Sequence, residues 1–136
     1  MTDHDLVAKK LARIATCLSD LRTARIELLR SDLREERFVE HTLQIAIQAA
    51  LDVASYIVSS DRLGEPSSNR ALFATLAQRG VIDLALADRL ASMAGFRNIL
   101  VHGYDDVQIG VVEDIVRNHL GDLDAFIVAA KTRAGF

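Results

Sequence analysis

The sequence predicts an all-α protein, an antiparallel helical bundle that forms a single domain over residues 1–136. Three observations lead to this expectation. The chain contains one proline and seven glycines, too few to supply the turns of a many-stranded sandwich or barrel. Long stretches contain no helix breaker, and apolar residues recur in them at intervals of three and four, the period of a packed helix. Half of the residues are apolar, which is enough for one sizeable core.

Two long helices are predicted in the first half of the chain. The first, from about Asp3 to Arg30, carries an apolar stripe that Arg25 interrupts, made of Val7, Leu11, Ile14, Leu18, Leu21 and Leu28. The second, from about Leu33 to Ser60, carries the stripe Val39, Leu43, Ala46, Ala50, Val53 and Ile57. The alanines of the second stripe would allow a neighbouring helix to approach closely.

The clearest loop lies at Asp61 to Ser68, where Gly64 and Pro66 stand close together. A shorter helix follows from about Ser67 to Arg79, with an apolar inner face made of Leu72, Phe73 and Leu76. We expect Gly80 to end this helix.

Two further long helices complete the predicted bundle. Asp83 is a good N-cap for the first of them, which runs to about His102 and has the inward-facing residues Leu86, Leu90, Met93, Arg97 and Leu100. The last helix, from about Val107 to Lys131, would bury Val112, Val116, Leu123, Phe126 and Ala130. The expected architecture is therefore four long helices and one short helix, joined by short loops.

Cysteine and histidine usage and the apolar runs exclude several classes of protein. The lone Cys17 cannot form an intramolecular disulfide and is interpreted as a small core residue. No Cys/His cluster has metal-ligand spacing, and no glycine-rich phosphate loop is present. The sequence contains no run of roughly 18 apolar residues that would predict a membrane span. The acidic start of the chain is unlike a signal peptide. We expect a cytoplasmic protein without a metal or other cofactor.

The net charge of −3 gives no general reason to expect nucleic-acid binding. Arginine nevertheless outnumbers lysine by thirteen to three. Arginine suits buried ion pairs and phosphate recognition better than lysine does, because its planar guanidinium presents paired donors. The composition therefore allows a local phosphate site without predicting one.

A charge falls on the inward-facing stripe of the fourth helix at Arg97, between Met93 and Leu100. A buried guanidinium needs a carboxylate, backbone carbonyls or a bound anion, because an unpaired buried charge is costly. Position alone favours a structural ion pair, for example with Asp52, and leaves an anion site as the alternative.

His102 lies five residues after Arg97, in the last turn before Gly103. At 100° per residue the two side chains are about 140° apart, so one straight helix does not place them on the same face. A helix C-terminus favours imidazolium, which suits an acid/base role, although a surface histidine is the simpler interpretation. Asn98 shares the face of His102 and could orient it. Tyr104 follows, and its simplest role is to pack its ring at the helix end.

A polar line runs along the second helix at spacings of four, three, four and four, formed by Arg37, His41, Gln44, Gln48 and Asp52. Such a line is usually a solvated face. Here, however, the two glutamines stand in a segment that is apolar on nearly every other side, which favours a polar interface or groove. Both interpretations remain open from the sequence.

Residues 95–107 (Gly-Phe-Arg-Asn-Ile-Leu-Val-His-Gly-Tyr-Asp-Asp-Val) resemble the motif of HEPN-domain proteins. Within that group they are most similar to the HepT-like toxins of MntA/HepT toxin–antitoxin systems, whose motif is Arg, four residues, His, any residue, Tyr. The resemblance extends to residues 36–37, 44–54, 63–67 and 73–82, in the same order along the chain. Together these segments cover about half of the sequence.

The resemblance implies a homodimer in which the Arg and His of both subunits meet in an interface cleft. It implies a metal-independent endoribonuclease toxin that acts on tRNA or mRNA, with Arg97, His102 and Asn98 as catalytic residues. The cleft could also be lined by Arg37, Gln44, Gln48 and Asp52. The implied partner is an MntA-like nucleotidyltransferase antitoxin, which transfers AMP to Tyr104.

A second class of function is a non-catalytic helical partner, or substrate-binding module, of a nucleotidyltransferase. Arg97 and Tyr104 would then bind the partner or a nucleotide. The intact series Arg-Asn-x3-His-x-Tyr favours the enzyme over this module. A purely structural bundle would not account for a charge on the inward-facing stripe so close to His102.

Overall fold

The computed structural model describes residues 3–61, 68–102 and 108–135. In these ranges it contains six α-helices, one 3₁₀ turn and no strand, which confirms the predicted all-α class. The elements are α1 (Asp3–Arg22), η1 (Ile26–Leu28), α2 (Leu33–Ser60), α3 (Asn69–Gln78), α4 (Leu84–His102), α5 (Ile109–Asn118) and α6 (Leu120–Ala134).

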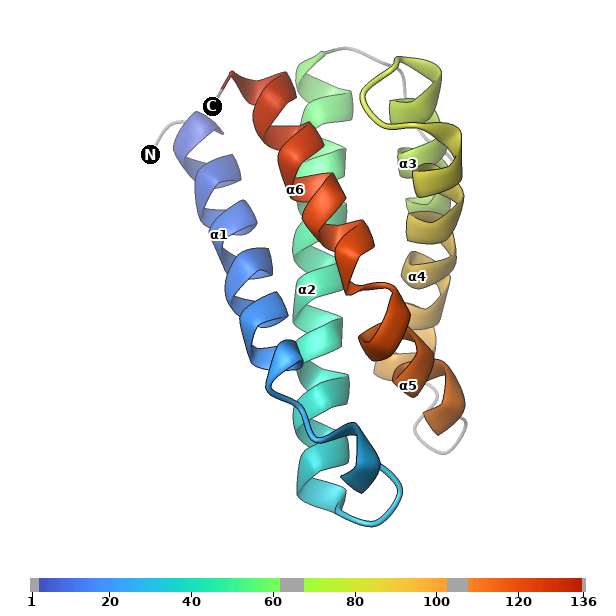
Figure 1. Cartoon of the computed structure of the whole chain (residues 1–136). Coiled ribbons are helices and arrows are strands. Elements are labelled where there is room, and N and C mark those ends of the chain that lie inside the picture. The colour runs from blue at the N-terminus through green and yellow to red at the C-terminus, as the bar shows by residue number, and fades with distance from the viewer. Residues whose placement is uncertain (1–2, 62–67, 103–107, 136) are drawn as a thin grey trace.

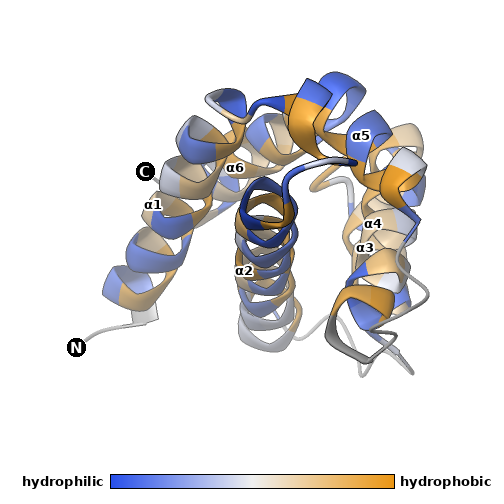
Figure 2. Cartoon of the chain, turned by 90° about the horizontal axis from the view of Figure 1, so that it is seen from below, coloured by the Kyte–Doolittle hydropathy of each residue, from blue (hydrophilic) through white to orange (hydrophobic). Residues whose placement is uncertain are grey.

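The helix α2 is the centre of the bundle (Figure 1). It packs against α1 and α6 on one side and against α3 and α4 on the other. Seen along its axis, α2 is surrounded on three sides, and its fourth side is covered by no other described helix (Figure 2). This open side of α2 lies between α1 and α4.

The core consists of the apolar stripes that the sequence predicts. Every residue of the predicted α2 stripe is buried, and so are all five residues predicted for the last helix. Phe73 of α3 meets Phe126 of α6 edge to face, with ring centroids 5.9 Å apart, a favourable arrangement for two aromatic rings. Cys17 is buried in the core as expected, and burial raises the pKa of its thiol. Leu28 and Leu100, by contrast, are only partly buried.

The first helix is shorter than predicted and ends at Arg22 rather than near Arg30. The amide of Thr23 bonds to the carbonyl of Asp20 at 3.0 Å, so the last turn tightens to i→i+3 bonding. The chain then forms the separate turn η1. The helix α2 begins after Asp32, whose side chain accepts hydrogen bonds from the amides of the second and third helical residues.

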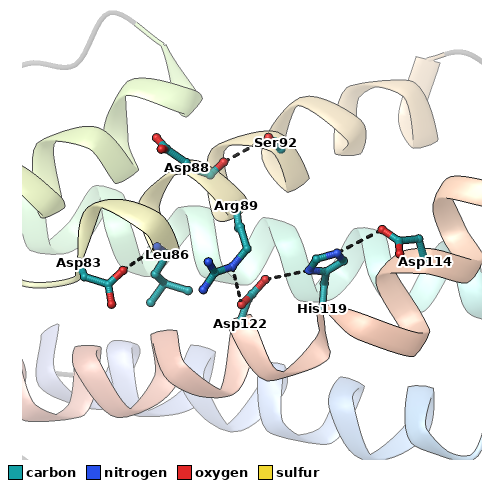
Figure 3. A network of polar contacts seen from close by, with 8 residues as sticks. All are labelled: Asp83, Leu86, Asp88, Arg89, Ser92, Asp114, His119 and Asp122. Carbon is teal, nitrogen blue, oxygen red and sulfur yellow. Dashed lines mark hydrogen bonds and ion pairs between the residues drawn. The ribbon is translucent and has the colours of Figure 1, made fainter.

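The last predicted helix is divided into α5 and α6, which corrects the expected number of helices. The break is at His119, whose φ of −125° and ψ of 4° are not helical. Its ring nitrogens lie 3.1 Å from Asp114 and 3.2 Å from Asp122, and Asp122 also accepts a bond from Arg89 at 2.9 Å (Figure 3). These contacts hold the two helices and α4 together at the break, where the sequence has no proline.

Two predicted helix ends are confirmed, the end of α3 at Gly80 and the start of α4 at Asp83. Gly80 has a φ of 75°, and the amide of Val81 bonds to the carbonyl of Leu76 at 2.9 Å, which is the Schellman arrangement that ends a helix. Asp83 accepts a hydrogen bond from the amide of Leu86 at 2.7 Å (Figure 3). Asp83 is therefore the N-cap of α4.

Among the described helices, α2 is the one long and apolar enough to cross a membrane. Of its most apolar stretch, 61% is buried inside the bundle. A core helix of a soluble protein passes the same test, and the packing of α2 against its neighbours accounts for its apolar residues.

Glu40 lies on α2 one turn after Glu36, and burial together with Glu36 raises the pKa of its carboxyl from 4.5 to about 7. The folded state thus binds this proton more tightly than the unfolded state. The resulting stabilisation is complete below about pH 4.5 and disappears as the pH rises through about 7. We expect Glu40→Gln to raise the Tm at pH 8, where the wild-type carboxylate is charged, and to raise it much less at pH 4.5.

Thermal melts followed by circular dichroism at the two pH values test this expectation. The exposed Glu27 is the control, because Glu27→Gln removes a carboxylate that is not buried. A Tm difference for Glu40→Gln that is equal at both pH values would contradict it.

Candidate functional site

A polar cavity of about 190 Å³ opens beside the uncovered side of α2. Three helices supply its walls: α1, α2 and α4. Its lining consists of Lys10, Arg13, Gln44, Ile45, Gln48, Ala49, Asp52 and Arg97. The structure thus brings Arg97 together with three of the five residues of the predicted polar line, Gln44, Gln48 and Asp52, which favours the groove over a plain solvated face for these residues.

Asp52 is paired from both sides within this cavity. Its Oδ2 accepts a hydrogen bond from Lys10 Nζ at 2.9 Å, and its Oδ1 accepts one from Gln48 Nε2 at 2.8 Å. The predicted ion pair between Asp52 and Arg97 is therefore wrong. The physical reason is that α1 packs directly against α2 and delivers a lysine to the carboxylate.

Arg97 is half-buried, and its Nε atom is buried without a hydrogen-bond partner among the described residues. Leaving a buried charged donor unpaired is costly, whereas a charge-assisted bond to an anion would satisfy it. Because Arg97 lines the cavity, an anion bound there can supply the missing acceptor. Of the two interpretations of Arg97, the geometry favours the anion site.

The other predicted site residues lie elsewhere or outside the described part of the chain. Arg37 and His41 are exposed on earlier turns of α2 and do not line the cavity, and Asn98 is exposed on α4. His102 is the final residue of α4, but its side chain is outside the described residues, as is all of Tyr104. The meeting of Arg97 with His102 therefore stays a prediction.

Sequence analysis missed two cationic residues of the cavity, Lys10 and Arg13 of α1. They are three residues apart and so share a face of the helix, immediately beside the buried Leu11 and Ile14. Nothing in their spacing distinguishes them from an ordinary solvated face. Only the packing of α1 on α2 places them opposite Arg97.

A larger cavity of about 360 Å³ lies between α4 and α5. Its lining includes the apolar residues Met93, Phe96, Val111 and Ile115. It also includes Arg89, Asp114 and His119 of the polar network in Figure 3. It contains none of the predicted site residues. The smaller cavity at Arg97 is therefore the candidate functional site.

An all-α bundle whose third long helix, α4, carries an Arg-x4-His motif with its arginine facing a polar cavity is typical of the HEPN class of proteins. The family model described as Ribonuclease HepT-like matches residues 8–130. The chain belongs to this HepT-like family.

Two relatives are named as nucleases. The mRNA nuclease HepT of Shewanella oneidensis is 32% identical over 130 residues, which are 94% of this chain and 98% of the relative. The tRNA nuclease HepT of Aphanizomenon flos-aquae is 34% identical over 77 residues, or 57% of this chain and 52% of the relative.

Solved structures agree with this assignment. A toxin–antitoxin complex with AMP-PNP contains a chain that is 32% identical, with a TM-score of 0.89 over 94% of this chain and 98% of that one. The tri-AMPylated HEPN toxin of Shewanella oneidensis in complex with MNT antitoxin gives a TM-score of 0.88, at 32% identity over 97% and 99% of the two chains. The predicted HEPN, HepT-like fold is confirmed.

Proposed function

We propose that this protein is the ribonuclease toxin of a toxin–antitoxin pair, and that its partner is an MntA-like nucleotidyltransferase antitoxin. The relatives named as nucleases support this function, since one of them aligns over nearly its whole length. The observation that carries it is Arg97, whose buried Nε has no hydrogen-bond partner among the described residues, at a cationic cavity of an otherwise acidic chain. A cytoplasmic location belongs to the same proposal, and the proposed RNA substrate and nucleotide-using antitoxin support it.

The proposed reaction is attack of an RNA 2′-OH on the adjacent phosphorus. The bond to the 5′-oxygen of the next nucleotide breaks, which leaves a 2′,3′-cyclic phosphate and a 5′-hydroxyl. Arg97 holds the phosphate and stabilises the charge of the pentacoordinate transition state. His102 acts as general base or acid, and Asn98 orients the phosphate or His102. Because the nucleophile belongs to the substrate, no metal-activated water is required.

We propose that the complete site forms in a homodimer. Arg97 and His102 are about 140° apart around one helix axis, and a two-fold axis can bring such groups from two subunits together. The uncovered side of α2, which carries the cavity, is the face available for such a partner (Figure 2).

Tyr104 is the proposed site of control by the antitoxin. Solved relatives include a tri-AMPylated toxin and a toxin–antitoxin complex with the variant Y104A. AMP on Tyr104 would add bulk and negative charge two residues from His102 and repel the RNA backbone.

Cleavage of total RNA by the purified protein in excess EDTA tests the enzyme proposal. We expect chelator-resistant cleavage that yields fragments with 2′,3′-cyclic phosphate ends. Intact mass, measured on the same sample, establishes whether the protein carries AMP. Unmodified protein that binds the antitoxin but leaves RNA intact would favour the non-catalytic partner instead.

A further inference from the structure

The cavity at Arg97 concentrates positive charge in a chain whose net charge is −3. Three cationic residues line it, Lys10, Arg13 and Arg97, against a single carboxylate, Asp52. The remaining polar lining consists of two neutral glutamine side chains. The cavity therefore has an excess of two positive charges, which favours an anion.

These charges are arranged so that the carboxylate does not neutralise the arginines. Both oxygens of Asp52 are already used, by Lys10 at 2.9 Å and by Gln48 at 2.8 Å. Neither Arg13 nor Arg97 forms an ion pair within the described part of the chain. Lys10, rather than either guanidinium group, thus compensates the one acidic group among the lining residues of the cavity.

The two guanidinium groups come from helices that are far apart in sequence, α1 and α4, and line one small cavity. Arg13 is exposed, whereas Arg97 is half-buried and its buried Nε has no acceptor among the described residues. Two like charges at one cavity repel each other, and an anion between them relieves this repulsion. A phosphate has several acceptor oxygens and can accept from both arginines at once.

We propose that Arg13 and Arg97 form a two-arginine subsite for one phosphate of the RNA, and that Lys10 keeps this subsite open by occupying Asp52. The identity of the anion rests on the proposed ribonuclease function. Arg13 is a binding residue in this scheme. Lys10 is a positioning residue, because it acts through Asp52 and not on the RNA.

Binding of a fluorescein-labelled single-stranded RNA, measured by fluorescence anisotropy, tests the role of Arg13. All variants are made in a His102→Ala background, so that no RNA is cut during the titration. We expect Arg13→Gln to weaken binding about tenfold at low salt, and to reduce the slope of log Kd against log salt by about 0.7, as for the loss of one phosphate contact. Lys9→Gln is the control, because Lys9 is an exposed cation of the same helix outside the cavity.

Equal binding by the Arg13 and Lys9 variants would overturn the subsite. This result is distinct from a failure of the ribonuclease proposal, in which protein with His102 intact does not cleave RNA whatever its affinity. Circular dichroism melts of each variant separate a loss of binding from a loss of folding.

A double-mutant cycle between Lys10 and Asp52 tests the positioning role. Lys10→Met leaves Asp52 with a free oxygen beside Arg97, and we expect RNA affinity to fall about tenfold. Adding Asp52→Asn removes the competing charge, so the double variant is expected to recover to within about twofold of the parent. A lysine that bound RNA directly would instead cost the same affinity in the Asp52→Asn background as in the parent background. Persistent weak binding by the stably folded double variant would therefore overturn the role assigned to Lys10.

Discussion

Replacing His102 by alanine is expected to reduce RNA cleavage by about a thousandfold while leaving the fold unchanged. A positioned acid/base group contributes on the order of 10²–10⁴ to the rate of a proton-transfer step. His102 is the last residue of α4, so its replacement removes no intrahelical bond from the middle of the helix. The measurement is the initial rate of cleavage of a defined RNA under single-turnover conditions, with the Tm of both proteins recorded.

The matched control for this prediction is His119→Ala. His119 is also a histidine at a helix end, but it belongs to the polar network between α5 and α6 (Figure 3). It lines the cavity between α4 and α5 and not the cavity at Arg97. We expect the His119→Ala substitution to lower the Tm and to leave the cleavage rate of the folded protein within a fewfold of the wild-type rate. Full toxicity of the His102→Ala protein in growing cells would contradict the assignment of His102.

Replacing Tyr104 by phenylalanine is expected to produce a toxin that the antitoxin no longer silences by modification. Phenylalanine keeps the ring and removes the hydroxyl that is proposed to accept the AMP. With ATP and the antitoxin present, wild-type protein should gain the mass of one or more AMP groups and lose its RNA cleavage. The Phe variant should stay unmodified at this position and remain active.

The control for this experiment is Tyr56→Phe, because Tyr56 is the other tyrosine of the chain and is partly buried on α2. This variant should be modified and silenced like the wild type. If the antitoxin still abolishes cleavage by the Tyr104→Phe protein through a mass increase elsewhere, Tyr104 is not the controlling site.

Most of the fold could be predicted from the sequence because core positions recur with helical spacing. The α2 stripe from Val39 to Ile57 is buried throughout, and Gly80 and Asp83 mark real helix ends. The two errors lie at Thr23 and His119. At both positions ordinary residues end a helix through their hydrogen bonds. Because neither helix end is marked by a glycine or a proline, the sequence contains no recognisable signal for it.

The candidate site could be predicted only in part. Arg97 was identifiable because a charge stands on an apolar stripe. Lys10 and Arg13 were not, because their role depends on how α1 packs across α2, and this packing also decided that Asp52 pairs with Lys10. Contacts between helices remote in sequence carry no local pattern, so the partner of a buried charge is the least predictable element of the site.

The positions of the first turn of α1 and the last turn of α6 matter for any group attached near them. The first turn of α1 and the last turn of α6 are close together, at the opposite end of the bundle from the end of α4 (Figure 1). The 19 residues of α4 span about 28 Å at 1.5 Å per residue. An affinity handle, a fluorophore or a surface linker at either terminus is thereby held away from the motif. Immobilised protein can present its motif end to RNA in solution.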